Sequence, residues 1–201
     1  MFNPRVEHGC EAEEEGGAKL IIGFCGKLQS GKSTVATHLV KAHNFIRVRF
    51  AGPLKDMVKA LGLTEEEYDG SRKEEPCELL GGKTPRWAMQ SLGTEWGRDL
   101  IDPQLWVRAW QKRVDSICLQ NPSASIVTDD VRFPNEAAAI RLVGGRLIYI
   151  ERNQDLLQAD GTLHPSERFA FTPDSVLHNF GTIEDLFKKV RQELGLVSAK
   201  D

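Results

Sequence analysis

The sequence has 201 residues, of which 40 % are hydrophobic and 27 % are charged, and its net charge at pH 7 is −3. This length suffices for one sizeable core with a small insertion, and the near-neutral charge lacks the basic field with which proteins gather nucleic acid. Because no apolar run approaches the roughly 18 residues that span a bilayer, we expect no membrane partner and a cytoplasmic location.

The first 18 residues differ in composition from the rest of the chain. They hold a single arginine against five glutamates and almost no periodic apolar residues. Such a composition predicts an acidic flexible tail, and the lack of an apolar run behind basic residues argues against a secretory signal. We therefore expect one folded domain over residues 19–201.

Short apolar runs alternate with helical patterns in that domain. The apolar runs predict buried strands at 20–25, 45–50, 126–128, 147–150 and 176–177, and helical spacing predicts helices at 35–43, 135–143 and 183–194. Strands separated by helices favour a five-stranded parallel sheet covered on both faces, which is a three-layer α/β fold. Residues 53–120 show only helical patterns and predict a helical insertion, and the Gly-, Pro-, Ser- and Asp-rich residues 152–173 predict a lid.

The clearest motif lies between the first predicted strand and the first predicted helix. Residues 26–33 match G-x-x-x-x-G-K-[ST], the phosphate-binding loop, or P-loop. Glycines permit the turn in which backbone N–H groups wrap a phosphate, while the lysine neutralises phosphate charge and the final serine ligates Mg²⁺. We therefore predict a nucleoside triphosphate with Mg²⁺, bound by Gly26, Lys27, Gln29, Ser30, Gly31, Lys32, Ser33 and Thr34.

A second signal follows the predicted strand at 126–128. Asp129 and Asp130 come directly after it, so they lie at the carboxyl edge of the sheet, where ligands of open α/β folds bind. Either carboxylate can serve magnesium. Arg132 would project near the same edge and can bridge donor and acceptor phosphates.

Residues 84–100 predict an amphipathic helix with an informative polar face. At about 100° per residue, one arc of this helix holds Arg86, Gln90, Thr94 and Arg98. Two cations, an amide and a hydroxyl suit a phosphate plus a base edge, although a solvated helix face has the same composition. Trp106 and Trp110, one turn apart further on, are better explained by core packing.

Taken together, these residues resemble the bacteriophage deoxynucleoside monophosphate kinases, which belong to the nucleoside monophosphate kinase group of P-loop proteins. The resemblance spans roughly residues 20–190. Besides the P-loop, it is carried by Phe50-Ala51-Gly52-Pro53-Leu54-Lys55, Arg86-x-x-x-Gln90-x-x-Gly93-Thr94-Glu95-x-x-Arg98, Asp130-Val131-Arg132-Phe133-Pro134-Asn135-Glu136 and Asn179-x-Gly181-Thr182.

The resemblance implies ATP-dependent phosphorylation of a deoxynucleoside monophosphate for DNA precursor synthesis, with a helical acceptor-binding insertion and a mobile lid. It favours Asp130 over Asp129 as the magnesium carboxylate, with Lys32 and Arg132 as the other catalytic residues. It places acceptor binding at Leu54, Lys55, Arg86, Gln90, Thr94, Arg98 and Arg132, further nucleotide binding at Asn179 and Gly181, and a lid motif at His164 and Glu167. Arg152 or Arg168 can complete the site when the lid closes.

Two other functions fit the same motifs. A different P-loop metabolite kinase, such as a dephospho-coenzyme A kinase, is one, because Asn179-x-Gly181 also resembles that family. A nucleotide-dependent binding switch that passes nothing to an acceptor is the other. A homodimer formed through apolar residues of the insertion is also left open, and a phage-encoded protein of this kind would act in the host cytoplasm.

Overall fold

The structure is a computed structural model, and it describes residues 19–152 and 171–196. At its centre lies a five-stranded sheet in the order β2-β3-β1-β4-β5, in which every neighbouring pair is parallel. The strands are β1 (Ile21–Cys25), β2 (Ile46–Arg47), β3 (Ile126–Thr128), β4 (Arg146–Arg152) and β5 (Ser175–Asn179). Each predicted apolar run thus forms a strand of the predicted parallel sheet, although β2 is shorter than expected.

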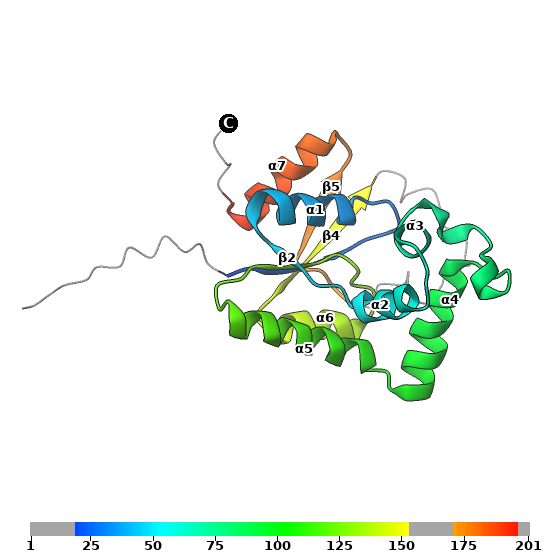
Figure 1. The fold of residues 1–201 in the computed structure, drawn as a ribbon. Helices are drawn as coiled ribbons and strands as arrows, with labels where there is room; N and C mark the ends of the chain where they lie inside the picture. The colour runs from blue at the N-terminus through cyan, green and yellow to red at the C-terminus, as the bar shows by residue number, and fades with distance from the viewer. Residues whose placement is uncertain (1–18, 153–170, 197–201) are drawn as a thin grey trace, which may run out of the picture.

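Two pairs of helices cover the faces of the sheet (Figure 1). One face is covered by α1 (Lys32–His43) and α7 (Ile183–Leu194), and the other by α5 (Leu105–Gln120) and α6 (Pro134–Leu142). The central strand β1 divides its side chains between two cores: Ile22 and Phe24 pack toward α1 and α7, while Ile21 and Cys25 pack toward α5 and α6. Burial on both faces explains why the strands are continuous apolar runs rather than alternating ones.

The helical insertion lies beyond the carboxyl ends of β2 and β3, at the right of Figure 1. It contains α2 (Gly52–Ala60), α3 (Glu65–Tyr68), the 3₁₀ turns η1 (Ser71–Glu74) and η2 (Glu78–Leu80), α4 (Pro85–Ser91) and a π-helix, η3 (Leu92–Ile101). The predicted end of the insertion at residue 120 is too late. Because Trp110, Val114 and Ile117 of α5 are buried in the core beneath the sheet, that helix belongs to the central layers.

The helix predicted at 84–100 is not a continuous α-helix. After α4 its hydrogen bonds widen to the i→i+5 pattern of a π-helix, and at its end Asp102 N donates to Gly97 O at 3.0 Å. Trp106 of α5 packs against this segment: its indole N–H donates to Gly93 O at 2.7 Å, and a Cβ at Gly97 would lie 2.6 Å from its ring. Trp106 therefore anchors the π-helix of the insertion on α5.

Within the two described stretches, none of the helices has both the length and the apolar character needed to cross a bilayer. The predicted tail at 1–18 and the lid residues His164, Glu167 and Arg168 lie outside the described residues.

Candidate active site

The P-loop connects β1 to α1 in a conformation that requires its glycines. Gly26 and Gly31 have φ angles of 140° and 108°, and a Cβ at Gly26 would lie 2.4 Å from Ile150 O. The Lys32 ammonium is folded onto the loop, where it donates to Gly26 O at 2.7 Å and to Lys27 O at 2.6 Å. The loop is thus shaped to present N–H groups to a phosphate, with a cation within reach of the same place.

Side chains from the ends of β4 and β5 donate hydrogen bonds to carbonyl oxygens of the P-loop. Asn179 donates from Nδ2 to Ser30 O at 2.9 Å, and Arg152 donates from Nη1 to Gln29 O at 3.0 Å. Gly181 lies in the turn before α7, where a Cβ would approach Asp185 Oδ2 to 2.7 Å. The structure therefore places both Asn179 and Arg152 at the P-loop.

Asp129 is the carboxylate that lies beside the P-loop serine. Ser33 Oγ donates to Asp129 Oδ2 at 2.7 Å, and Arg47 Nε and Arg49 Nε donate to Oδ1 at 2.8 and 3.1 Å. Only 3 % of Asp129 is exposed. Burial alone would raise the pKa of Asp129, but the hydrogen bond from Arg47 and the charges of Arg49 and Arg47 lower it to about 2, so this group is ionised at neutral pH.

Asp130 has a different environment, which corrects the expectation that it would lie next to Ser33. Its oxygens accept hydrogen bonds from Phe50 N at 3.1 Å and Ala51 N at 2.9 Å, so it ties β3 to the start of α2. Burial and the neighbouring charge of Asp129 raise the pKa of Asp130. The two carboxylates have different neighbours because successive side chains of a strand alternate in direction: Val127 and Asp129 point to the α1 face, and Asp130 points away from it.

A second charged cluster connects the segment after β2 to the insertion. Arg49 Nη1 donates to Asp69 Oδ2 at 2.5 Å, and Lys55 Nζ donates to Asp69 Oδ1 at 2.6 Å, with Lys73 Nζ at 3.6 Å from the same oxygen. Burial and the charge of Arg49 lower the pKa of Lys55. Lys55 was expected here; its neighbour Leu54 is buried in the core.

Sequence reasoning missed Arg47, Arg49 and Asp69. A signal for the two arginines was present in the apolar run at 45–50. Arg47 and Arg49 alternate there with the buried Val48 and Phe50, so an extended chain would turn both arginines to one side. Asp69, which lies in a turn after α3, had no comparable pattern.

The side chains of the polar arc predicted on residues 84–100 do not share one environment, because the two arginines contact different elements. Arg86 pairs with Glu74 of η1, whereas Arg98 donates from Nη2 to Glu136 Oε1 of α6 at 2.6 Å and lies over the Phe133 ring, 3.9 Å from its centre. Gln90 is exposed and Thr94 is half-buried. Because the π-helix changes the angle per residue, a constant 100° step does not describe this segment.

Glu136 is a buried carboxylate that joins the insertion to α6. Besides the contact with Arg98, its Oε2 accepts from Arg132 N at 2.7 Å and Phe133 N at 3.1 Å. Burial and the charge of Asp130 raise the pKa of Glu136 to about 7. The Arg132 side chain is exposed, and among residues 19–152 and 171–196 no hydrogen bond or ion pair of its guanidinium is found.

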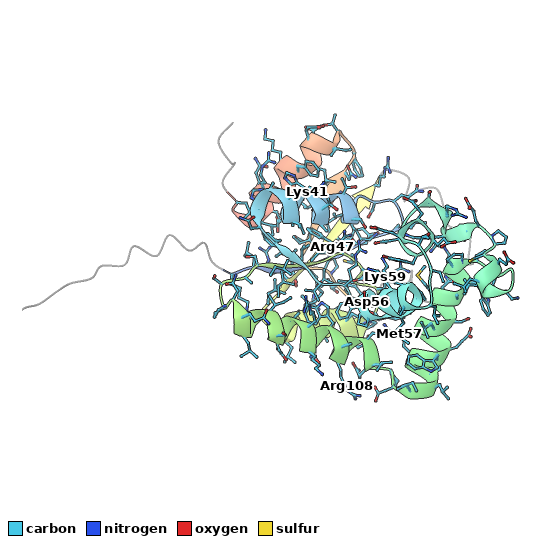
Figure 2. The ribbon with its side chains drawn as sticks, in the orientation of Figure 1. Lys41, Arg47, Asp56, Met57, Lys59 and Arg108 are labelled. Atoms are coloured by element: carbon cyan, nitrogen blue, oxygen red, sulfur yellow. The ribbon has the colours of Figure 1, made fainter. Side chains whose placement is uncertain are left out.

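These contacts form one continuous chain from the P-loop to the insertion. Ser33, Asp129, Arg49, Asp69 and Lys55 follow one another at 2.7, 3.1, 2.5 and 2.6 Å. Figure 2 labels Arg47 on the edge strand β2, between Lys41 of α1 and Asp56 of α2 in this view. A phosphate on the P-loop and an anion held by Arg49 and Lys55 would therefore be close neighbours.

Comparisons with known proteins identify related kinases. A family model described as deoxynucleotide monophosphate kinase matches residues 83–190. A protein of Acanthamoeba polyphaga mimivirus, provisionally named a deoxynucleotide monophosphate kinase, is 37 % identical over 187 residues, which are 85 % of this chain and 94 % of that protein. The deoxynucleoside-5'-monophosphate kinase of Escherichia phage T5 is 38 % identical over 58 residues, 29 % of this chain and 22 % of that one.

Among solved structures, shikimate kinase from Aquifex aeolicus aligns with a TM-score of 0.47 and 13 % identity, covering 88 % of this chain and 96 % of that one. A likeness at this level carries no conclusion about the reaction, which depends on the site and on the sequence relatives.

Proposed function

Because this chain belongs to the deoxynucleotide monophosphate kinase family, we propose that it transfers the γ-phosphoryl group of ATP·Mg²⁺ to the phosphate of a deoxynucleoside monophosphate, giving the diphosphate. The observation that carries this proposal is the chain of contacts from Ser33 to Lys55, which puts a donor-phosphate loop beside a pair of cations. Its nucleotide substrates imply a cytoplasmic reaction.

The residues of the donor side fit a magnesium nucleotide. The glycine conformations of the P-loop leave room for close approach of a phosphate, and Ser33 and Asp129 present a hydroxyl and an ionised carboxylate side by side. Magnesium, when bound, neutralises charge on the transferred phosphoryl group. Mg²⁺ commonly uses one or two carboxylates with water and phosphate oxygens, so Asp129, rather than Asp130, has the right position and charge.

Lys32 would leave the loop carbonyls to contact the β- and γ-phosphates, as the P-loop lysine does in this class of protein. The acceptor needs no general base, because a phosphate monoester with a second pKa of about 6 is already largely ionised at neutral pH. Catalysis therefore consists of positioning and charge neutralisation, with Arg49 and Lys55 holding the acceptor phosphate and the exposed Arg132 near the transferred group.

The remaining predicted residues act at the periphery of this site. Arg86, Gln90 and Thr94 of the insertion are candidates for contacts with the sugar or base. Arg98, which contacts Glu136 and Phe133, would instead fix the insertion relative to α6. Arg152, bonded to the P-loop, is a candidate for contact with the donor phosphates.

A product assay tests the proposal. ATP·Mg²⁺ is incubated with a panel of deoxy- and ribonucleoside monophosphates and with dephospho-coenzyme A, and the phosphorylated products are separated. Formation of a deoxynucleoside diphosphate that disappears with Lys32→Ala, a variant expected to keep the fold, supports the proposal. Phosphorylation of dephospho-coenzyme A alone, or ADP without any phosphorylated acceptor, would replace it by a different metabolite kinase or by a binding switch.

A further inference from the structure

Asp69 is a carboxylate surrounded by cations at the acceptor side of the site. Arg49 and Lys55 donate to its two oxygens at 2.5 and 2.6 Å, and Lys73 lies 3.6 Å from one of them. Arg49 comes from the segment between β2 and α2 and Lys55 from α2, whereas Asp69 comes from the turn after α3. Burial alone would raise the pKa of Asp69, but the hydrogen bonds from Lys55 and Arg49 hold it well below its usual range, so the group is an anion.

The arrangement around Asp69 is the one that a phosphate monoester requires. A guanidinium and an ammonium converge on two oxygens of one planar anion, and phosphate accepts the same charge-assisted hydrogen bonds with one more oxygen and about twice the charge. Arg49 also donates to Asp129, which accepts from Ser33, so the place held by Asp69 is adjacent to the donor site. The Asp69 side chain is 30 % exposed, which allows it to leave without opening the core.

We propose that Asp69 occupies the acceptor-phosphate subsite in the substrate-free protein and that the phosphate of the acceptor displaces it. This inference rests on the proposed function, since it names the subsite of the same reaction. In the free protein Asp69 keeps Arg49 and Lys55 paired and correctly placed. On binding, the acceptor phosphate takes over both cations, and the turn that carries Asp69 moves away.

An internal competitor lowers the apparent affinity for the acceptor. The measured dissociation constant equals the intrinsic one divided by the fraction of molecules in which the subsite is open. If Asp69 fills the subsite in about nine molecules out of ten, its removal should tighten phosphate binding by about tenfold. A purely structural role predicts the reverse, because cations without an organising carboxylate would bind phosphate less well.

The test compares Asp69→Asn with Asp56→Asn. Asp56 is an exposed carboxylate on α2, labelled in Figure 2, and it is next to Lys55 in the chain, so its removal makes the same change in net charge nearby. Calorimetric titration with 2-deoxyribose 5-phosphate, which has no base, is carried out on protein with ADP·Mg²⁺ on the P-loop. The thermal midpoint of each variant shows whether it is folded.

We expect Asp69→Asn to bind 2-deoxyribose 5-phosphate about tenfold more tightly than the unchanged protein, and Asp56→Asn to bind within about twofold of it. The KM for a deoxynucleoside monophosphate should fall in the same proportion. Equal or weaker binding by Asp69→Asn than by Asp56→Asn would overturn the proposal. The two proposals can fail separately. If the unchanged protein phosphorylates no nucleotide but Asp69→Asn still binds the sugar phosphate more tightly, the proposed reaction is wrong, whereas the proposal that Asp69 occupies a phosphate subsite is supported.

Discussion

Replacing Asp129 by asparagine, and Asp130 by asparagine in a matched variant, separates the two carboxylates that follow β3. The side chains differ by one position but contact different partners. Asp129 accepts from Ser33, Arg47 and Arg49, whereas Asp130 accepts only from backbone N–H groups among the hydrogen bonds found. Removal of the first charge therefore affects the P-loop serine and two arginines, whereas removal of the second affects the connection to α2 and the pKa of the nearby Glu136.

The pKa values give the size of the effect on stability. A fall of the Asp129 pKa from the usual 3.8 to about 2 stabilises the folded state at neutral pH by about 2 kcal/mol, which Asp129→Asn should lose. Because the folded-state pKa is lowered, this stabilisation is present above pH 3.8 and is lost as pH falls through about 2. Asp130 has a raised pKa, so its neutralisation relieves repulsion and offsets the loss of one hydrogen bond, about 1 kcal/mol.

Urea unfolding followed by tryptophan fluorescence measures both variants at pH 7 and at pH 3. We expect Asp129→Asn to lose about 2 kcal/mol at pH 7 and less at pH 3, and to reduce kcat by at least about 10²-fold. Asp130→Asn should change the free energy of unfolding by less than about 1 kcal/mol and retain activity within about tenfold. If Asp130→Asn abolishes turnover while Asp129→Asn retains it, the assignment of the magnesium carboxylate from the geometry is wrong.

Two further predictions concern the insertion and its attachment to α6. Gly97→Ala places a Cβ 2.6 Å from the Trp106 ring, and this overpacking should destabilise the fold by about 1–3 kcal/mol and lower Tm. The control is Gly52→Ala, which has no atom within 4 Å of the new Cβ and should leave Tm nearly unchanged. Equal losses of Tm in the two variants would contradict the packing of Gly97 against Trp106. The pKa of Glu136 rises from 4.5 to about 7 in the folded protein. The stability that this carboxyl group contributes to the folded state is therefore fully present below pH 4.5 and is lost as pH rises through 7. Glu136→Gln should abolish this dependence of about 3 kcal/mol, and an unchanged difference between the two proteins from pH 4 to pH 8 would refute it.

The sheet could be predicted from the sequence because its strands are buried on both faces. A strand of this kind is a short apolar run between helical patterns, and all five runs gave strands in a parallel sheet. The π-helix could not be predicted in this way. Its widened turns coincide with a tertiary contact, in which Trp106 donates to Gly93 O and packs against Gly97, and hydrophobic periodicity carries no information about such a contact.

The site was predictable where its residues are close in sequence. The P-loop is a local motif, so its geometry followed from its residues. The two-residue period of a strand predicts that Asp129 shares the α1 face with the buried Val127 and that Asp130 does not. Asp69 lies 20 positions from Arg49, and only the folded chain brings them together.

The position of β1 in the sheet has a consequence for synthesis of the protein. This strand, which precedes the P-loop, pairs with β3 through Ile21 and Ile126 and with β4 through Ile22 and Arg146. The strand β1 and the P-loop therefore leave the ribosome before β3 and β4, by on the order of ten seconds at ordinary elongation rates. During that interval a wholly apolar strand has no sheet to join, so folding is slow and open to aggregation, and early termination yields a complete P-loop motif without a functional loop.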